Sequence, residues 1–365
     1  MQHALAVIDR VEGWALRVPT DALEADGTFA WDRTTLVMAE VRAAGATGIG
    51  YSYAGAAAGQ LINAVFAKTL VGDDAFAIPR LWDAMVSAVR NLGWRGLCAN
   101  AISAVDVALW DLKAKLLQRP LVQLLGAARA SVPIYGSGGF TSYSRERLAE
   151  QLARWVEQDG CRWVKMKVGT DPARDTERVE TARAAVGTAG LFVDANGAFA
   201  RKEALAFAER IAELGVSWFE EPVSSDDLEG LRLMRDRAPA GMEIAAGEYG
   251  YEPFYFRRML EAGAVDVLQA DATRCCGITG FLRAAALADA YALPLSAHTA
   301  PAVHLHVCCA APRVRHVEWF HDHVRIEHML FDGAPVPAHG AIAPDLSRPG
   351  LGLEFKRSDA ARFAA

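Results

Sequence analysis

The chain has 365 residues, of which 52% are hydrophobic and 22% charged, so it is long enough to bury a large core in more than one domain. Its net charge of -6 is spread along the chain and leaves no basic stripe for a nucleic-acid backbone. No apolar stretch reaches the roughly 18 residues of a membrane helix, and the opening MQHALAVIDR lacks the basic region of a secretory signal. We expect a cytoplasmic protein with no nucleic-acid or membrane partner.

The six cysteines are predicted to be free, buried thiols. Two pairs of them are immediate neighbours, which suits neither ordinary disulfide geometry nor the spacing of zinc ligands. They are Cys98, Cys161, Cys275, Cys276, Cys308 and Cys309.

Residues 1–128 are predicted to form an α+β capping domain. Residues 34–43 (TTLVMAEVRA) alternate as a strand does, and the glycines that follow, Gly45, Gly48 and Gly50, indicate a hairpin.

Further along the same domain, the apolar residues from Leu81 to Leu117 recur at helical spacing. Within this helical segment, Asp106 and Asp111 are expected to face solvent or to cap loops.

Residues 129–330 alternate short apolar strands with amphipathic helices. Eight such strands fit a closed (β/α)8-type TIM barrel or an open doubly wound sheet. We favour the barrel, because charged residues end consecutive strands and only a closed barrel brings all of them to one mouth. Residues 331–365, rich in turn formers, are predicted to return to the capping domain. The predicted strands are 131–137, 161–169, 191–197, 216–222, 242–248, 265–271, 293–298 and 316–320.

Three carboxylates, Asp194, Glu220 and Glu248, end successive predicted strands. Gathered at a barrel mouth they repel one another, and a hard divalent cation with oxygen ligands relieves that repulsion. Such a ligand set favours Mg²⁺. The alternative is that each carboxylate is satisfied separately by a helix N-terminus.

Two lysines, Lys165 and Lys167, are two residues apart in a strand and therefore point to the same side. Like charge and a nearby cation are expected to lower the pKa of one of them toward the value of a general base near neutral pH. The alternative, an exposed pair, is disfavoured by the apolar residues that flank them.

Asp271 and His298 end adjacent predicted strands and are expected to form a dyad in which the carboxylate orients the imidazole. Glu318, at the eighth strand, is a candidate to hydrogen-bond a substrate carboxylate if it is protonated, or else to pair with Arg313 or Arg315. A zinc site is the less favoured alternative for the remaining histidines near the C-terminal end of the barrel: His304, His306, His316, His321, His323 and His328.

The motifs KMKVG, VDANG, WFEEP, AAGE, DATRCCGITG, SAH and VEW, in this order, resemble the mandelate racemase subgroup of the enolase superfamily. The resemblance implies a modified (β/α)7β barrel with a capping domain that the C-terminal tail completes. It also implies one Mg²⁺ per active site, a small carboxylate substrate and a homo-oligomer, either a dimer or an octamer.

Carried over to this sequence, the resemblance implies that Lys165 touches the substrate carboxylate and that Lys167 is the base on one face. His298, supported by Asp271, is then the acid or base on the other face, and Glu318 meets the enolate oxygen. Magnesium and these groups would stabilise the dianion that forms when the α-proton leaves.

The segment DATRCCGITG differs from another branch of the superfamily at Asp271, and it departs from the family pattern once, at Cys276. The muconate-lactonizing branch has a lysine where this chain has Asp271, which argues against cycloisomerase chemistry. Cys276 precedes Gly277 where the family often has a second glycine, so the shape of this loop is in question.

The most favoured function is dehydration of a sugar acid, an aldonate or aldarate, to a 2-keto-3-deoxy acid. A racemase or epimerase that uses Lys167 and His298 as its two bases is the first alternative, and a non-catalytic barrel is a distant one.

Substrate specificity is expected to lie in the capping domain, where residues 17–31 and 48–60 read as loops that close over the barrel. Candidate substrate-binding residues are Asn196, Tyr51, Tyr53 and Trp31, the last three with packing as the alternative.

Overall fold

Three antiparallel strands, β1 (Ile8–Ala25), β2 (Ala30–Ala43) and β3 (Ala46–Tyr53), form the N-terminal sheet. The computed structural model describes residues 6–365, so the first half of the opening MQHALAVIDR lies outside the described residues. β2 is the central strand, and its residues 36–41 are buried. Val37, Ala39 and Val41 belong to an apolar cluster mostly within the N-terminal part, whereas Leu36 and Met38 belong to a second cluster that includes barrel and C-terminal residues.

Glycines allow helix α4 (Leu97–Leu116) to pack directly on β3. A Cβ atom at Gly50 would lie 2.2 Å from the carbonyl oxygen of Ala104, and one at Gly48 would lie 2.1 Å from that of Ala108. Gly45 alone lies in the hairpin turn, with a φ of 78°. The predicted hairpin is therefore confirmed, with Gly45 in its turn and Gly48 and Gly50 in its second strand.

Two acidic residues of α4 hydrogen-bond to residues that are far away in the sequence. Asp106 accepts hydrogen bonds from the backbone N–H and hydroxyl of Thr279, and Asp111 accepts them from the N–H groups of Ile49 and Leu351. Both carboxylates are buried, so the solvent alternative is wrong. Loop capping holds only for the contact of Asp111 with Leu351, because Ile49 lies in β3 and Thr279 lies in the first turn of the helix that begins at Gly277. The other helices here are α1 (Ala57–Leu61), the π-helix η1 (Ile62–Phe66), α2 (Ala67–Leu70), α3 (Ile78–Ala88) and α5 (Leu121–Leu125).

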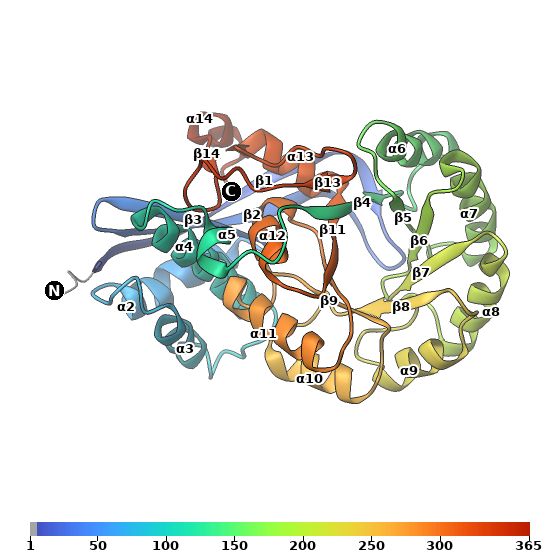
Figure 1. Ribbon diagram of the computed structural model, residues 1–365, viewed down its shortest axis with the longest axis horizontal. Helices are drawn as coiled ribbons and strands as arrows, with labels where there is room; N and C mark the ends of the chain where they lie inside the picture. Colours follow the sequence, from blue (N-terminus) through green and yellow to red (C-terminus); the bar gives the residue numbers. More distant parts are fainter. Residues whose placement is uncertain (1–5) are drawn as a thin grey trace.

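Eight parallel strands form a closed barrel, confirming the predicted fold class (Figure 1). Closure occurs where the first strand pairs with the last, with Tyr135 opposite Glu318. The strands are β4 (Val132–Gly138), β5 (Trp163–Lys167), β6 (Gly190–Asp194), β7 (Val216–Glu220), β8 (Glu243–Ala246), β9 (Val267–Ala270), β10 (Leu295–Ala297) and β11 (Val314–Phe320).

Helices cover the outside of the barrel, while large aromatic side chains fill its interior. Tyr135, Phe192 and Trp218 are buried there, with Phe192 stacked on Trp218 at 5.0 Å between ring centroids. The part of the barrel interior that holds these rings is a packed core. A reaction site is therefore expected at the carboxyl ends of the strands. The helices are α6 (Arg145–Glu157), α7 (Pro172–Val186), α8 (Arg201–Ala212), α9 (Leu228–Arg237), α10 (Pro253–Glu261), α11 (Gly277–Ala290), α12 (Pro301–Ala310) and α13 (His321–Leu330).

The C-terminal segment runs from the barrel back to the N-terminal sheet, as expected. Ala364 forms a β-bridge with Leu16, and the backbone N–H of Ala365 donates to the carbonyl of Ala15 at 3.1 Å. The domain limits at residues 128 and 330 stay predictions. The segment contains β12 (Phe331–Asp332), β13 (Ala341–Ile342), β14 (Glu354–Phe355), α14 (Arg357–Ala360) and the 3-10 helix η2 (Ala361–Phe363).

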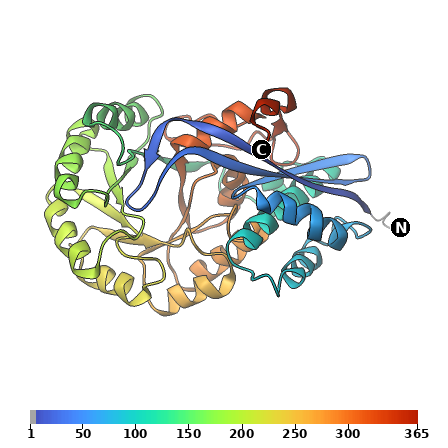
Figure 2. The same cartoon turned by 180° about the vertical axis from the view of Figure 1, so that it is seen from behind.

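The β1–β2 hairpin extends across the barrel mouth, as Figure 2 shows in blue. Its turn is in close contact with the strand ends, because a Cβ at Gly27 would lie 2.4 Å from the carbonyl oxygen of Ala195. The hydroxyl of Thr170 donates to the carbonyl of Asp26 at 2.6 Å. Residues 17–31 are therefore mostly paired strand, and the prediction of a loop there is wrong.

The second predicted loop, residues 48–60, is also mostly regular structure. It comprises the end of β3, a short connection at residues 54–56, and most of α1. The capping contribution to the barrel mouth thus comes from a sheet.

The six cysteines are free and buried, which confirms the thiol prediction. None of the described helices combines the length and apolar character needed to cross a membrane.

Candidate active site

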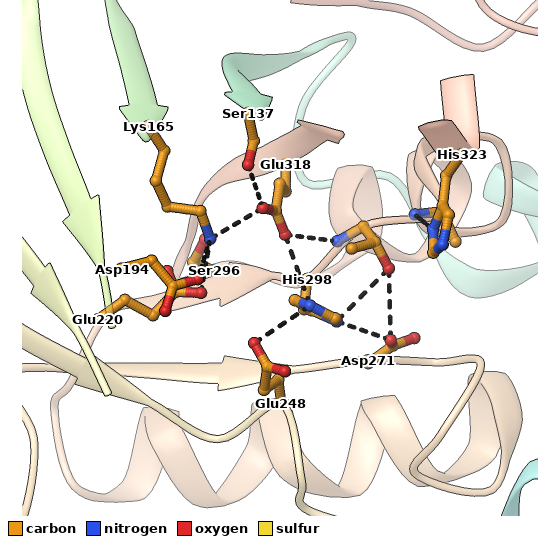
Figure 3. Close-up of polar contacts among 12 residues, drawn as sticks. Ser137, Lys165, Asp194, Glu220, Glu248, Asp271, Ser296, His298, Glu318 and His323 are labelled. Carbon is orange, nitrogen blue, oxygen red and sulfur yellow. Dashed lines mark hydrogen bonds and ion pairs between the residues drawn. The ribbon is translucent and has the colours of Figure 1, made fainter. Parts of the chain in front are cut away.

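The charged residues singled out in the sequence meet at the carboxyl ends of the barrel strands (Figure 3). Parallel strands of a closed barrel all end at the same face, so residues far apart in the chain become neighbours there. Lys165, Lys167, Asp194, Glu220 and Glu318 lie on strands β5, β6, β7 and β11, while Glu248, Asp271 and His298 closely follow β8, β9 and β10.

Three carboxylates form a group whose geometry fits a metal ion. Asp194, Glu220 and Glu248 each offer an oxygen within 4.8 Å of the others, and all three side chains are buried. The Oε2 atom of Glu248 is buried and accepts no hydrogen bond from any described group, although Nε2 of His298 lies 3.2 Å from it. Burial and the nearby Asp194 raise the pKa of Glu220 well above its usual value. Oxygen ligands of this kind fit Mg²⁺.

The two lysines contact different members of this acidic group. The ammonium of Lys165 lies 2.5 Å from Oε1 of Glu220 and 2.8 Å from Oε1 of Glu318. That of Lys167 pairs with Asp194 and donates to Oδ1 of Asn196 at 2.9 Å. Both side chains are buried, so the alternative of an exposed pair is wrong.

The expected lowering of a lysine pKa is not what this arrangement produces. Burial and the charge of Lys165 lower the pKa of Lys167, but Asp194 and the other carboxylates outweigh both and raise it above its usual value. The same carboxylates are the candidate metal ligands. A lowered pKa therefore requires that their negative charge be taken up by a cation.

His298 and Asp271 form the predicted dyad. The Nδ1 atom of His298 lies 2.9 Å from Oδ2 of Asp271, and its Nε2 atom lies 3.2 Å from Oε2 of Glu248. Burial opposes ionisation of Asp271, but the hydrogen bond and charge of His298 hold its pKa below the usual range. An ionised Asp271 that binds Nδ1–H leaves Nε2 as the reactive atom of the imidazole.

Glu318 is held as a carboxylate, not as the protonated acid considered from the sequence. Burial opposes its ionisation, but Lys165 lowers the pKa of Glu318 to about 2. The hydroxyl of Ser137 and the backbone N–H of Thr299 donate to its two oxygens at 2.5 and 2.9 Å. The alternative partners, Arg313 and Arg315, pair instead with surface carboxylates of Asp289 and Glu243.

The backbone after several strands adopts left-handed conformations at residues other than glycine. The φ angles are 47° at Asn196, 37° at Glu221, 51° at Thr299 and 41° at Ala300. Such conformations cost about 1–3 kcal/mol each and concentrate at functional sites, where the surrounding structure holds them.

In the loop after β9, Cys276 stands where the family often has a glycine, and it adopts a left-handed conformation. Its φ is 67°, and the backbone N–H groups of Cys276 and Gly277 both donate to the hydroxyl of Ser103. These two hydrogen bonds to Ser103 therefore fix the loop against α4.

A cavity of about 630 Å³ lies between the strand ends and the N-terminal sheet. Lys167 and His298 open into it, as do three of the four candidate substrate-binding residues: Asn196, Tyr53 and Trp31. Tyr51 does not line this cavity. It is fully buried, and its hydroxyl donates to Glu327, which supports the packing alternative.

Two further residues of the cavity have no substrate-binding role predicted from the sequence. Arg274 pairs with Oε1 of Glu248 at 3.1 Å, and His323 lies at the start of α13. Arg274 carries a usable signal, since it stands three residues after Asp271 in the DATR motif. His323 carries none, because its position depends on how α13 follows β11.

The zinc alternative is not supported by the positions of the C-terminal histidines. Nε2 of His304 accepts from the N–H of Ala272, and Nδ1 of His306 accepts from that of Val122. Within residues 6–365, only His321 among them joins a three-residue group with possible metal ligands, beside Asp21 and Glu24.

Comparison with known families matches both parts of the chain. The family described as the mandelate racemase / muconate lactonizing enzyme N-terminal domain matches residues 9–126. The family described as enolase C-terminal domain-like matches residues 147–360.

Individual relatives agree with these matches. A mandelate racemase/muconate lactonizing enzyme-like protein from Rubrobacter xylanophilus is 50% identical, with a TM-score of 0.96 over 98% of this chain and 100% of that one. The L-talarate/galactarate dehydratase of Salmonella typhimurium is 33% identical over 82% of this chain and 77% of its own length. A variant of an L-talarate/galactarate dehydratase, solved with Mg and L-glucarate, superimposes with a TM-score of 0.89 at 28% identity, covering 100% of this chain and 95% of that one.

A cycloisomerase is also among the relatives. The 3,6-anhydro-alpha-L-galactonate cycloisomerase of Streptomyces coelicolor is 31% identical over 96% of this chain and 98% of its own length. Overall similarity therefore does not separate this chain from cycloisomerases, and the exclusion of cycloisomerase chemistry from Asp271 stays a prediction. From the two family matches and these relatives, we conclude that the chain belongs to the enolase superfamily, in its mandelate racemase subgroup.

Proposed function

We propose that the protein removes the proton α to the carboxylate of a sugar acid, an aldonate or aldarate, and eliminates water to give a 2-keto-3-deoxy acid. The observation that carries the proposal is the placement of Lys167 and His298 in one cavity, each beside a different candidate metal-binding carboxylate. The dehydratase relative, and the dehydratase variant solved with Mg and L-glucarate, support the substrate class.

The proposed cofactor is one Mg²⁺, held by Asp194, Glu220 and Glu248. When bound, it supplies positive charge for the substrate carboxylate as the α-carbon loses its proton. Lys165, with its ammonium buried between Glu220 and Glu318, adds a fixed positive charge at the same place.

The proposed proton transfers use opposite sides of the cavity. Lys167, as the neutral amine, takes the α-proton, and His298, as the imidazolium, gives a proton from Nε2 to the β-hydroxyl, which leaves as water. The resulting enol becomes the 2-keto acid by taking a proton at the β-carbon and losing the proton of its 2-hydroxyl. A positioned acid or base of this kind typically contributes about 10²–10⁴-fold to the rate.

Two alternatives use the same residues. A racemase or epimerase returns a proton to the α-carbon from the opposite face, which the pair Lys167 and His298 permits. A cycloisomerase rearranges bonds within one molecule and loses no water, and the Streptomyces relative favours keeping this candidate. The cytoplasmic location and the dimeric or octameric state stay predictions.

The test is incubation with Mg²⁺ and a set of mono- and dicarboxylic sugar acids and their lactones in deuterated water, followed by proton NMR and carbonyl trapping. A 2-keto acid formed with loss of water supports dehydration. Deuterium at the α-carbon with inversion and no keto product overturns it in favour of racemisation. An isomer of the starting compound overturns it in favour of cycloisomerisation.

A further inference from the structure

His323, on the first turn of α13, lies in the wall of the active-site cavity and is fixed by contacts from both parts of the chain. Its ring stacks on that of Tyr53 from β3, with centroids 3.4 Å apart and planes 9° from parallel. On another side it meets the ring of Phe320 edge-on at 5.0 Å. The imidazole is therefore held in one orientation, and only 8% of the residue remains exposed.

The backbone determines which ring nitrogen of His323 carries the proton. The N–H group of Ala300, held in a left-handed conformation, points at Nδ1 at 3.4 Å. A nitrogen that accepts a hydrogen bond carries no proton, so the proton of the neutral ring is on Nε2. Figure 3 shows the ring of His323 on the far side of His298 from the metal-binding carboxylates.

The ring is neutral and has one hydrogen-bond donor to spare. Burial and the nearby His298 lower the pKa of His323 well below its usual value, so the ring stays uncharged near neutral pH. Across residues 6–365, no group accepts a hydrogen bond from Nε2, although Nε2 is not among the buried atoms left without a partner. The Nε2–H group is thus open to the cavity.

We propose that His323 is a substrate-specificity residue, whose Nε2–H donates to a hydroxyl oxygen on the part of the sugar acid beyond the reacting carbons. This inference deepens the proposed function and rests on it. The role differs from those of Lys167 and His298, because the donor keeps its proton throughout the reaction.

The cavity around His323 has polar groups for a hydroxylated substrate chain as well as aromatic residues such as Trp31 and Phe320. Arg33, Thr34 and Thr35 of β2 line the same cavity. A site built to hydrogen-bond a substrate hydroxyl rejects analogues without it, because its own polar groups would be left unpaired. The recognised class is therefore an aldonate or aldarate with hydroxyls on the distal carbons, not an aryl acid such as mandelate.

The test compares His323→Phe and His323→Gln with the wild type on galactarate, arabinonate and mandelate. His323→Phe keeps a flat ring for the stack on Tyr53 but has no donor, whereas His323→Gln restores an N–H group. His328→Phe is the matched control, since His328 lies on the same helix and outside the cavity.

For His323→Phe, we expect kcat/KM on the preferred sugar acid to fall roughly 10- to 100-fold, mainly through KM. We expect partial recovery in His323→Gln, no change in His328→Phe, and no α-proton exchange on mandelate in the wild type. Nitrogen-15 NMR of histidine-labelled wild-type protein should show a neutral ring protonated on Nε2, and this measurement does not depend on the variants folding.

The outcomes separate this inference from the proposed function. If the wild type makes keto acid from a sugar acid but His323→Phe keeps the same selectivity, or if NMR places the proton on Nδ1, the role of His323 is overturned alone. If the wild type makes no keto acid from any of the acids, the proposed function is overturned and this inference with it.

Discussion

The imidazole of His298 and the carboxylate of Asp271 are joined at 2.9 Å between Nδ1 and Oδ2, and both side chains are buried beside the acidic group. This contact fixes the tautomer of His298, so that Nε2 is the atom presented to the cavity.

Replacing Asp271 by Asn is expected to lower turnover roughly 10- to 100-fold while leaving Mg²⁺ affinity nearly unchanged. The amide cannot stabilise an imidazolium and can present an N–H group to Nδ1, which reverses the tautomer. Turnover is measured by carbonyl trapping, or by α-proton exchange if no keto acid forms, and Mg²⁺ affinity by calorimetry. Wild-type turnover in Asp271→Asn would mean that the dyad has no part in the reaction.

Removal of Mg²⁺ with a chelator is expected to abolish turnover and to lower the melting temperature. A ligand present at about 100 times its Kd stabilises the folded state by about 2.7 kcal/mol, provided that it does not bind the unfolded chain. Glu248→Gln should weaken Mg²⁺ binding in calorimetry, because it removes a charged ligand. Glu229→Gln is the control, since that side chain is 89% exposed and lies on the outer helix α9. Equal Mg²⁺ affinity in the two variants would exclude Glu248 as a ligand.

Gly277→Ala is expected to destabilise the fold by about 1–3 kcal/mol. Gly277 has a φ of 84°, and a Cβ there would lie 2.2 Å from Oδ2 of Asp106. Two causes contribute, the strained backbone conformation and the clash with Asp106. Gly45→Ala separates them, because Gly45 has a φ of 78° but no atom lies within 4 Å of the position that a Cβ would take there. Urea unfolding should therefore show a larger loss for Gly277→Ala. Equal losses would mean that backbone strain alone accounts for the effect.

The stability of the protein is expected to fall between about pH 4.5 and pH 8 because of Glu327. Burial raises the pKa of Glu327 from 4.5 to about 8, although the hydroxyl of Tyr51 and the N–H of Ala302 donate to it. In that interval the folded state holds a proton that the unfolded state has lost. Raising the pH therefore favours unfolding, by at most about 1.4 kcal/mol per pH unit for one group, and the effect levels off above about pH 8.

Glu327→Gln tests this pH dependence, because the amide keeps an acceptor for Tyr51 and does not titrate. Urea unfolding at several pH values should give a shallower decline in the variant than in the wild type. Parallel curves would show that Glu327 is ionised in the folded protein throughout this range.

The sequence was sufficient for the barrel and for the eight charged residues at its mouth. Strand and helix periodicity are local properties, and a charged residue that ends an apolar strand is visible without knowing its neighbours. The closed barrel then brings such residues together whatever the details of packing. For the same reason the sequence alone indicates that Asp194, Glu220 and Glu248 lie together at the barrel mouth.

Other features depend on contacts between residues far apart in the chain, which no local pattern reports. Pairing of β1 with β2 places a segment that reads as a loop in a hairpin across the barrel mouth. Contacts with α11, β3 and the C-terminal segment bury Asp106 and Asp111. The charge state of Glu318 follows from its contact with Lys165, which belongs to a different strand of the barrel. His323 acquires its place only when α13 packs against Tyr53. The sequence alone thus determined the pattern of strands and helices and the charged residues at the strand ends. The ionisation states, the hairpin over the barrel mouth and the position of His323 were decided by tertiary packing, because each depends on which distant groups come into contact.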